Sequence, residues 1–546
     1  MTFVPAQEFA ARVLANLVDL GVEHVFVSPG SRSQALAIAA GQLADAGLVK
    51  LHVRLDERSS GFQALGVGKA TETPAIVITT SGTAVANLHP AALEAHHAGV
   101  PMILLTADRP AELRGVGANQ TTNQVGIFGD AVGLCLDVPA PDAGESVEVI
   151  RARAVLLAEQ AFTESLTTGQ PVQLNLAFRE PLSSVEPDAA AIFAVEMPVH
   201  DAGDETTDGH CGDDCQCHLG STEGGAGAPD TVIDLSLNTV VIAGDGGDAA
   251  RWYCTGLPLL AEPSSGVRDC PEAIAAYPLI LRSDPDLVAS IEQVLVFGKP
   301  TLTRTVQALV RRDGVRVLVD SGRHDVFMPT PFAEKIGDDV AFEGEAKREW
   351  LDAWRVSAKT QLEAADAMKP EANTLTRRAL VEAVYSAAGK EEPIILGASS
   401  LIREADIWAP NKVRQVYANR GLAGIDGTVA TAMGVAHGTG AAVRLLLGDL
   451  TLLHDAGSLA LAAGDENLNL QIVVGNDHGG SIFESLEVAK TIAAKPFEQL
   501  FKTPQAVDIS LLARAYGWQY HCPETADELA QALKTDGLVI IEVNLA

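Results

Sequence analysis

The sequence predicts an α/β protein with three consecutive doubly wound parallel-sheet domains, and three observations predict it. The chain has 546 residues, which is long enough for several domains. Hydrophobic residues make up 47% of it and aromatic residues only 5%, so small aliphatic side chains dominate, as in tightly packed α/β layers. Strand-like apolar runs alternate with helical patterns in three separate blocks, and this alternation is typical of parallel sheets covered by helices.

The charge and composition exclude several classes of protein. The net charge of −32 argues against nucleic acid or an anionic membrane as a partner. No apolar run is long enough to span a membrane, and the amphipathic N-terminal segment lacks the basic start of a signal peptide. The odd number of cysteines, 7, argues against a disulfide framework. We therefore expect a cytoplasmic protein.

The first predicted domain comprises residues 1–185. Its apolar runs alternate with helical patterns, which predicts a parallel sheet with helices on both faces. The expected strands are residues 22–28, 50–56, 75–80, 101–107 and 171–178. Residues 186–230 are rich in Gly, Asp and Thr and lack periodicity, so we interpret them as a flexible acidic linker.

The second predicted domain, residues 231–345, is expected to be Rossmann-like, with strands at residues 239–245, 293–298 and 315–320. A helical connector is expected over residues 346–373. The third predicted domain comprises residues 374–546. Its expected strands are residues 393–399, 413–419, 442–449, 470–476 and 538–544.

Acidic and amide side chains follow two neighbouring strands of the third block. One strand ends at Gly448-Asp449 and the next at Asn476-Asp477, closely followed by Gly479. The carboxyl ends of parallel strands meet at the edge where open α/β sheets bind ligands. Hard oxygen ligands there suit Mg²⁺ together with a diphosphate, and glycines let backbone N–H groups approach phosphates. The alternative is that Asp449 caps a helix while Asn476 makes a turn.

This stretch resembles the cofactor motif of thiamine-diphosphate enzymes, Gly-Asp-Gly followed roughly twenty-five to thirty residues later by Asn-Asn. It departs from that motif in two places, with Leu450 for the second Gly and Asp477 for the second Asn. The resemblance implies thiamine diphosphate with Mg²⁺ or Mn²⁺ as cofactors. Either Asn476 or Asp477 would be the second metal ligand. Residues 1–185 would bind the pyrimidine ring, and residues 374–546 the diphosphate and metal.

Glu57 is the candidate for activating the cofactor. It follows an expected strand together with Asp56 and precedes a helix rich in small residues. The alternative is that both acids only cap that helix. In thiamine-diphosphate enzymes a Glu at such a sheet edge hydrogen-bonds the aminopyrimidine ring, and it comes from a different subunit than the diphosphate site. The resemblance therefore implies a homodimer or a dimer of dimers.

Several longer segments are similar to one family, the 2-succinyl-5-enolpyruvyl-6-hydroxy-3-cyclohexene-1-carboxylate synthases of menaquinone biosynthesis. The most specific segments are SPGSRS, starting at residue 28, and NRGLAGIDG, starting at residue 419. Others are residues 54–66, 79–110, 117–129, 260–268 and 448–455. The resemblance implies that the chain decarboxylates 2-oxoglutarate and adds the resulting succinyl-semialdehyde carbanion to isochorismate.

Both implied substrates are dicarboxylates, so arginines are expected near the cofactor. Arg32, Arg109, Arg403 and Arg420 each follow a strand-like run, where ligand-binding loops lie. A single such arginine would more often be a solvated surface residue, and four in equivalent places favour a binding role. By resemblance, the substrate-binding residues are Ser31, Arg32, Arg109, Asn119, Gln120, Arg304, Ser399, Arg403, Arg420 and Phe497.

The resemblance implies roles for further residues. Gln120 would also act in catalysis, by positioning an oxyanion or a water. The cofactor would be held by Glu57, Ser81, Gly82, Ile425, Gly448, Asp449, Asn476, Asp477 and Gly479, with Ile425 as the apolar wedge beneath it. The metal would be held by Asp449, Asn476 or Asp477, and Gly479.

Two other motifs indicate alternatives. The linker carries Cys211, Cys215 and Cys217 between two histidines, which is the ligand chemistry of a zinc site without the spacing of a known zinc finger. It is the basis for an alternative hypothesis, a non-catalytic metal-binding regulatory protein. Residues 244–250, GDGGDAA, resemble a dinucleotide phosphate loop with incomplete glycine spacing, and we expect neither FAD nor NAD there. A second alternative is another thiamine-diphosphate carboligase, similar to acetohydroxyacid synthase.

Overall fold

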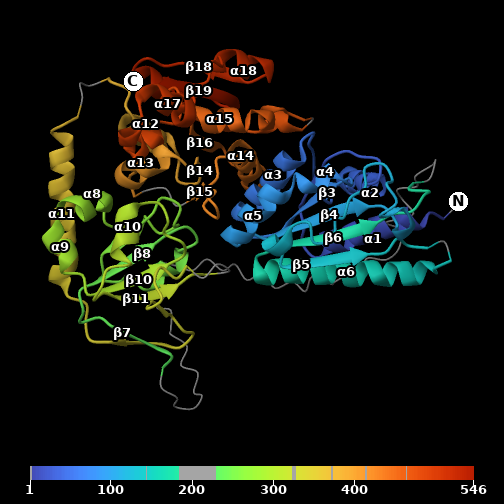
Figure 1. The fold of residues 1–546 in the computed structure, drawn as a ribbon, viewed down its shortest axis with the longest axis horizontal. Helices are drawn as coiled ribbons and strands as arrows, with labels where there is room; N and C mark the ends of the chain where they lie inside the picture. The colour runs from blue at the N-terminus through green and yellow to red at the C-terminus, as the bar shows by residue number, and fades with distance from the viewer. Residues whose placement is uncertain are drawn as a thin grey trace.

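The computed structural model describes residues 3–142, 144–183, 229–322, 327–369, 373–411, 415–462 and 464–545. They form three parallel sheets flanked by helices, which confirms the predicted fold class. We refer to residues 3–183, 229–345 and 373–545 as the N-terminal, central and C-terminal domains. The C-terminal domain lies above the central domain, and the N-terminal domain lies beside both (Figure 1). The cysteines of the expected linker metal site lie outside the described residues.

The N-terminal domain is a six-stranded parallel sheet in the order β2-β1-β3-β4-β6-β5. Alternate residues of its central strands enter different cores, since Ile76 and Ile78 pack on one face and Val77 on the other. The strands are β1 (His24–Val27), β2 (Lys50–Val53), β3 (Ala75–Thr79), β4 (Met102–Asp108), β5 (Leu134–Val138) and β6 (Pro171–Ala177). The helices are α1 (Pro5–Asp19), α2 (Gln34–Asp45), α3 (Glu57–Thr71), α4 (Thr83–Ala86), α5 (His89–Ala98), η1 (Ala111–Leu113), η2 (Gly129–Ala131) and α6 (Val147–Thr168).

The central domain has a five-stranded parallel sheet in the order β12-β11-β10-β8-β9, and a separate pair formed by β7 and β13. The strands are β7 (Thr231–Asp234), β8 (Thr239–Ala243), β9 (Leu259–Ala261), β10 (Gln293–Phe297), β11 (Arg316–Asp320), β12 (Glu334–Lys335) and β13 (Val340–Glu343). The helices are η3 (Asp248–Trp252), α8 (Tyr277–Ser283), α9 (Pro285–Ala289) and α10 (Arg304–Leu309).

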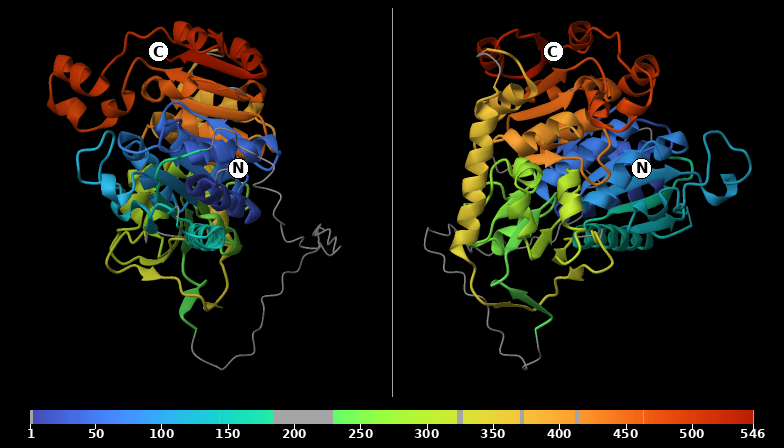
Figure 2. Two further views of the ribbon diagram at one scale, coloured as in Figure 1. Left: turned by 90° about the vertical axis from the view of Figure 1, so that its right-hand side faces the viewer. Right: turned by 60° about the vertical axis from the view of Figure 1, so that its left-hand side comes forward.

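The expected connector is helix α11 (Arg348–Asp366). It buries Trp350 and Trp354 against the central domain, and its C-terminal end leads to the C-terminal domain. Figure 2 shows it running alongside the central domain up to the C-terminal domain. The described part of the chain contains no helix with the length and apolar character that a membrane crossing requires.

The C-terminal domain is a second six-stranded parallel sheet, in the order β15-β14-β16-β17-β19-β18. Its strands are β14 (Ile394–Leu396), β15 (Val416–Ala418), β16 (Val443–Gly448), β17 (Leu470–Asn476), β18 (Gln519–His521) and β19 (Leu538–Asn544). The helices before β17 are α12 (Arg377–Ala387), α13 (Ser400–Trp408), α14 (Thr428–Thr439), α15 (Asp449–His454), η4 (Ala456–Leu459) and η5 (Asp465–Asn467). Those after it are η6 (Ser481–Ser485), α16 (Val488–Thr491), α17 (Ala494–Phe497), the π-helical turn η7 (Glu498–Lys502), α18 (Ile509–Ala515) and α19 (Ala526–Ala532).

Helices α3 and α14 pack closely and join the N-terminal to the C-terminal domain (Figure 1). Glycines permit this approach, because a Cβ atom on Gly66 would lie 2.2 Å from the Thr431 carbonyl oxygen, and one on Gly434 would lie 2.0 Å from that of Gln63. These two positions therefore exclude any side chain. The packing fixes the start of α3 against the chain segment that follows α15.

Candidate active site

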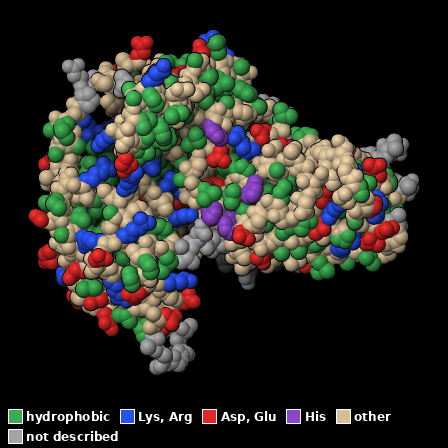
Figure 3. Space-filling model, viewed as in Figure 1, with side chains coloured by type: hydrophobic (Ala, Val, Ile, Leu, Met, Phe, Trp, Pro, Cys, Tyr) green, Lys and Arg blue, Asp and Glu red, His purple; other side chains and the backbone are tan. Residues whose placement is uncertain are grey.

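A cavity of about 610 Å³ lies between the central and C-terminal domains, within the range of small-molecule binding sites. On the C-terminal side its wall is formed at the carboxyl ends of β14, β16 and β17, where open α/β sheets bind ligands. Lys and Arg side chains gather over this junction on the face shown in Figure 3. The predicted site residues that line the cavity are Arg304, Ser399, Arg403, Ile425, Gly448, Asp449, Asp477 and Gly479.

Two acidic residues of this wall suit a divalent cation. Asp449 is only 5% exposed, and one of its oxygens accepts a hydrogen bond of 2.8 Å from the Gly479 N–H. Burial, together with the neighbouring Asp477 carboxylate, raises the pKa of Asp449. Two carboxylates that repel each other in a partly dry site are stabilised by a cation between them. The side chains present therefore fit the metal that the sequence predicts.

Asp477 and Asn476 differ in whether they line the cavity. Successive side chains of a strand point to opposite faces, and Asp477 lines the cavity with Gly475, whereas Asn476 is not among the described lining residues. Both ends of the buried Asn476 amide are engaged, because Nδ2 donates to Glu542 and Oδ1 accepts from the His478 N–H. The Asp477 carboxylate contacts Arg377 at 2.7 Å and the Ser481 hydroxyl, and both contacts are made by Oδ2.

The same wall can accommodate a diphosphate. Helices α13 and α15 begin at the cavity, so their N-terminal N–H groups provide a favourable environment for an anion. Gly479 has φ of +128°, and a Cβ there would lie 2.3 Å from the Lys502 carbonyl oxygen. A side chain is thus excluded from the loop that closes this end of the cavity.

Arg403 lines this cavity, whereas the nearby Arg420 lines a second cavity of about 500 Å³ between the three domains. Arg403 lies on α13 and donates to the Ser399 carbonyl oxygen at 2.7 Å, while the buried Arg420 donates to the Thr301 hydroxyl at 2.9 Å. Burial, together with the nearby Arg420 charge, lowers the pKa of Arg403. Two neighbouring guanidinium groups, one buried and one half-buried, favour a carboxylate-bearing ligand.

Two fully buried acids lie behind these arginines. Burial, together with the Asp406 charge, raises the pKa of Glu262 to about 8, and Glu262 accepts a hydrogen bond of 2.8 Å from the Leu302 N–H. Burial raises the pKa of Asp406 to about 6, and Tyr277 donates to its carboxylate at 2.8 Å. The contact between Tyr277 and Asp406 joins the central domain to α13, which forms part of the cavity wall.

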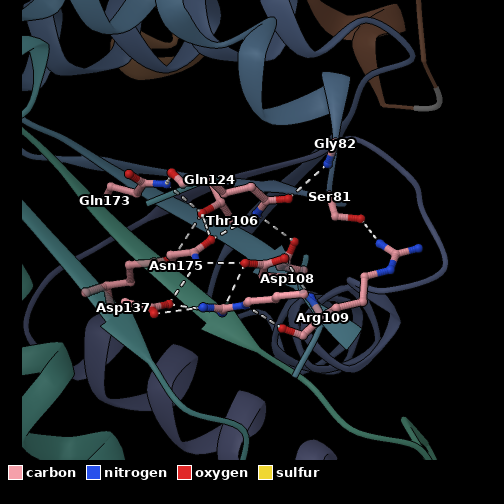
Figure 4. Close-up of polar contacts among 12 residues, drawn as sticks. Ser81, Gly82, Thr106, Asp108, Arg109, Gln124, Asp137, Gln173 and Asn175 are labelled. Carbon is pink, nitrogen blue, oxygen red and sulfur yellow. Dashed lines mark hydrogen bonds and ion pairs between the residues drawn. The ribbon is translucent and has the colours of Figure 1, made fainter. Parts of the chain in front are cut away.

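The predicted residues of the N-terminal domain form a second group at the carboxyl end of its sheet. Ser81 and Gln120 exchange hydrogen bonds with each other's backbone carbonyl, at 3.0 and 2.9 Å. Arg109 donates to the Ser81 hydroxyl, and the Gly82 N–H donates to Gln124 at 2.9 Å. Figure 4 shows how a buried polar network beneath them, including Asn175 and Asp108, links these loops.

Arg32 and Arg109 are both 9% exposed and lie near one another. Burial, together with the charge of Arg32, lowers the pKa of Arg109. Arg32 donates to the Phe178 carbonyl oxygen at 3.0 Å and lies 3.6 Å from the exposed Glu180 carboxylate. This pair repeats the arrangement of Arg403 and Arg420 on a different domain. The predicted Ser31 and Asn119 lie in exposed loops beside it.

Glu57 is the first residue of α3, at the carboxyl end of β2, and Asp56 caps the helix by accepting from the Arg58 N–H. The half-buried Glu57 carboxylate accepts a hydrogen bond of 3.2 Å from Asn87. Its neighbour Arg58 contacts Asp455, just beyond the C-terminal end of α15, the end remote from Asp449. Glu57 is not among the described residues that line the cavity of the same chain.

Two further predicted residues differ in their relation to the cavity, which Arg304 lines and Phe497 does not. Arg304 is 75% exposed and pairs with Glu487 at 2.9 Å. Phe497 ends α17 and stacks on Phe501 at 5.9 Å, and it is not among the described lining residues. The loop 244–250 contributes to a second cavity of about 500 Å³ between the three domains. That this loop binds no dinucleotide stays a prediction.

Sequence reasoning missed several residues of the site. Arg282 lines the cavity from the end of α8, and Gln124 and Arg377 orient predicted residues from behind. For Arg282 and Arg377 the only sequence signal is a position near a helix end, which many surface residues share, whereas Gln124 lies in residues 117–129, a segment that carries the family resemblance. Glu262 lies inside a segment that carries the family resemblance, yet a buried acid cannot be distinguished there from an exposed one.

The fold and the two groups of residues define a thiamine pyrophosphate enzyme. Residues 7–127 match the family model "Thiamine pyrophosphate enzyme, N-terminal TPP binding domain", and residues 374–543 match its C-terminal TPP binding domain. More particularly, the chain belongs to the 2-succinyl-5-enolpyruvyl-6-hydroxy-3-cyclohexene-1-carboxylate synthase family. Proteins of that name from Leifsonia xyli and Clavibacter michiganensis are each 42% identical to it, and each comparison covers 99% of this chain and 96% of the relative. The protein of that name from Kineococcus radiotolerans is 41% identical with the same coverage.

Proposed function

We propose that the chain decarboxylates 2-oxoglutarate and transfers the remaining four-carbon unit to isochorismate, giving 2-succinyl-5-enolpyruvyl-6-hydroxy-3-cyclohexene-1-carboxylate and CO₂ in menaquinone biosynthesis. The relatives' names and the match to both thiamine-pyrophosphate domains support the proposal. The structural observation that carries it is the presence of two arginine pairs, Arg32 with Arg109 and Arg403 with Arg420, on the two domains of that match. The guanidinium fork matches carboxylate geometry, so two pairs suit dicarboxylate substrates better than pyruvate, which has one carboxylate.

Thiamine diphosphate, when bound, supplies the electron sink for the decarboxylation. The residues of the chain then bind, orient and exclude water. Asp449 and Asp477 would hold Mg²⁺ or Mn²⁺, with the backbone of Gly479 beside them. The engaged Asn476 amide favours Asp477 as the second side-chain ligand. Ile425 would support the cofactor from the cavity wall.

Each arginine pair would orient a carboxylate-bearing substrate. Arg403, Ser399 and Arg304, which line the cavity, would bind on the side of the diphosphate, and Arg420 and Phe497, outside that lining, would belong to the same group. Arg32 and Arg109, with Ser31, Asn119 and Gln120, would bind from the N-terminal domain. Ser81 and Gly82 would hold the cofactor there, and Gln120 would position an oxyanion or a water.

Glu57 would hold the aminopyrimidine ring in the tautomer that accepts the thiazolium proton. Because Glu57 does not line the cavity of its own chain, we infer that it completes the cavity of a second copy. The functional unit would then be a homodimer with two equivalent sites, or a dimer of dimers. A homodimer would account for the placement of the two groups of predicted residues on different domains of one chain.

The proposal is tested by incubating the purified protein with 2-oxoglutarate, isochorismate, thiamine diphosphate and Mg²⁺, and identifying the products by mass spectrometry. We expect the named product and CO₂, with no turnover when pyruvate replaces 2-oxoglutarate. Equal or faster turnover of pyruvate would favour an enzyme similar to acetohydroxyacid synthase. No turnover of either acid, with metal retained by the linker, would favour the non-catalytic alternative.

A further inference from the structure

The loop between β15 and α14, residues 419–427, carries two of the site residues. Arg420 is 4% exposed, and Ile425 lines the cavity. Ala423 within the loop has φ of +59°, and Gly427 at its end has φ of +61°. A loop with such turns is held by its surroundings rather than by regular secondary structure.

Glu94 binds this loop from the N-terminal domain. It lies on α5, is 4% exposed, and its two carboxylate oxygens accept hydrogen bonds from consecutive backbone N–H groups, Gly421 at 2.8 Å and Leu422 at 2.7 Å. Burial raises the pKa of Glu94, but two N–H donors, one on each oxygen, favour the ionised carboxylate, and hydrogen bonds to a carboxylate are stronger than neutral ones. The approach is close, since a Cβ on Gly421 would lie 2.6 Å from the Glu94 carbonyl oxygen.

The central domain holds the same loop from a second side. Lys299 donates to the Gly421 carbonyl oxygen at 2.9 Å, and Thr301 accepts from Arg420 at 2.9 Å. The peptide groups beside Arg420 are therefore bound by a carboxylate from one domain and an ammonium group from another. These contacts define where Arg420 and Ile425 stand relative to the cavity.

We propose that Glu94 is a positioning residue: its carboxylate, seated on the Gly421 and Leu422 N–H groups, sets the position of Arg420 for substrate and of Ile425 for the cofactor. The role of these two residues rests on the proposed function. Glu94 itself lies outside the described lining of the cavity and would act only through the loop.

The Glu94→Gln variant tests this role with little change in volume. A glutamine amide offers one oxygen and one NH₂ group, so one of the two loop N–H groups faces a donor and the loop must move. Gly421→Ala should displace the same loop by steric contact with the Glu94 backbone. The matched control is Asp465→Asn, because Asp465 is another buried carboxylate, which accepts from the Ala462 N–H and from Arg54 of the N-terminal domain.

Calorimetric titration with thiamine diphosphate and Mg²⁺ measures the cofactor Kd without turnover, and steady-state kinetics give KM for 2-oxoglutarate. We expect Glu94→Gln and Gly421→Ala each to raise both constants by about 10-fold, the effect of losing one charged hydrogen bond. In the double variant, Kd and KM should be no higher than in the single variant with the higher constants, because both changes displace the same loop. Asp465→Asn should lower the melting temperature and leave both constants within about 2-fold of the wild type.

The proposal is overturned if Glu94→Gln melts at a lower temperature but binds cofactor and substrate as Asp465→Asn does, or if the two changes multiply in the double variant. If Glu94→Gln fails to fold, a Gly421→Ala variant with unchanged constants overturns it equally. Wild-type protein that binds the cofactor but makes no product would instead count against the proposed function, since the calorimetric comparison does not depend on that product.

Discussion

Asp449 and Asp477 are the residues on which the proposed metal site depends. We expect Asp477→Ala to raise the Mg²⁺ concentration needed for half-maximal activity by about 10-fold or more, because it removes an oxygen ligand. Asn476→Ala should leave that concentration unchanged and destabilise the fold by about 1–3 kcal/mol, since the buried Glu542 loses the donor to Oε1 and keeps only Tyr520, which donates to Oε2. Mg²⁺ titrations of both purified variants, with melting curves, make the comparison. The reverse pattern would assign Asn476 as the ligand.

Glu57 is proposed to act on the cofactor, so its conservative variant should separate chemistry from folding. We expect Glu57→Gln to fold normally and to lose turnover by about 100-fold or more, because the amide cannot shift between donor and acceptor as the acid does. The helix cap is provided by Asp56, which the variant retains. Steady-state rates beside circular dichroism spectra provide the measurement. Near-normal turnover would refute the role of Glu57.

Arg403 is expected to bind substrate rather than cofactor. Truncation in Arg403→Ala removes a half-buried charge partner for a carboxylate, so kcat/KM for 2-oxoglutarate should fall by roughly 30-fold, corresponding to about 2 kcal/mol. The calorimetric Kd for thiamine diphosphate should stay near the wild-type value. An equal loss of both quantities would place Arg403 at the cofactor instead.

At the residue scale, the sequence could predict which side chains follow strands but not which way they point. Asp477 lines the cavity and Asn476 does not, because β17 ends at Asn476 and the chain turns there, and the sequence does not show where the strand ends. Glu94 and Glu262 could not be recognised, since only the folded chain shows that they are buried. Their sequence positions are equally compatible with a solvated helix or loop.

At the scale of elements, the predicted strands with long apolar runs all occur, with ends that differ by a few residues. The strands that the sequence reasoning missed include β5, β9, β12 and β18, which are short or partly polar. Strand β12 consists of two exposed charged residues, Glu334 and Lys335, and no hydrophobic periodicity can reveal it. These residues form a strand because they pair in parallel with β11, and their own sequence does not show this.

The contact between β2 and α14 should make stability sensitive to acid. The ring centroids of His52 and His437 lie 4.0 Å apart with the rings tilted by 47°, and Arg54 donates to His437 Nε2 at 3.1 Å, which requires a neutral imidazole. Burial, together with the Arg54 charge, lowers the pKa of His437 to about 3. Because folding lowers the pKa of His437, the contribution of His437 to the free energy of unfolding is complete above about pH 6.5. It is lost as the pH falls below that value, by about 1.4 kcal/mol per pH unit.

The variant His437→Gln tests this because it keeps an acceptor for Arg54 and cannot titrate. Between pH 7.5 and 5.5 we expect the free energy of unfolding of the wild type to fall by roughly 1–1.5 kcal/mol more than that of His437→Gln. The apparent melting temperature of the wild type should fall further accordingly. Scanning calorimetry at both values of pH measures it. If the stability of the two proteins changes equally with pH, protonation of His437 is not the cause of the acid sensitivity.

At the scale of the whole molecule, the three consecutive domains could be predicted because each repeats the same alternation of strand and helix. The arrangement of the site could not be predicted in this way, since it depends on which surfaces of the three domains pack against each other. Within one chain, α3 packs on α14 and Glu57 stands outside the cavity of Asp449. A second copy, related by a two-fold axis, is the simplest way to bring the two together.

Hybrid dimers test this central claim most directly. Glu57→Gln and Asp449→Ala chains carrying different affinity tags are coexpressed, and dimers that contain one of each are isolated by two successive purifications. If Glu57 completes the partner's cavity, one site of each hybrid bears both changes and the other bears none, so the hybrid should recover about half of the wild-type activity while either homodimer stays inactive. Hybrids no more active than the two homodimers would contradict the account, because every site would then contain one of the changes.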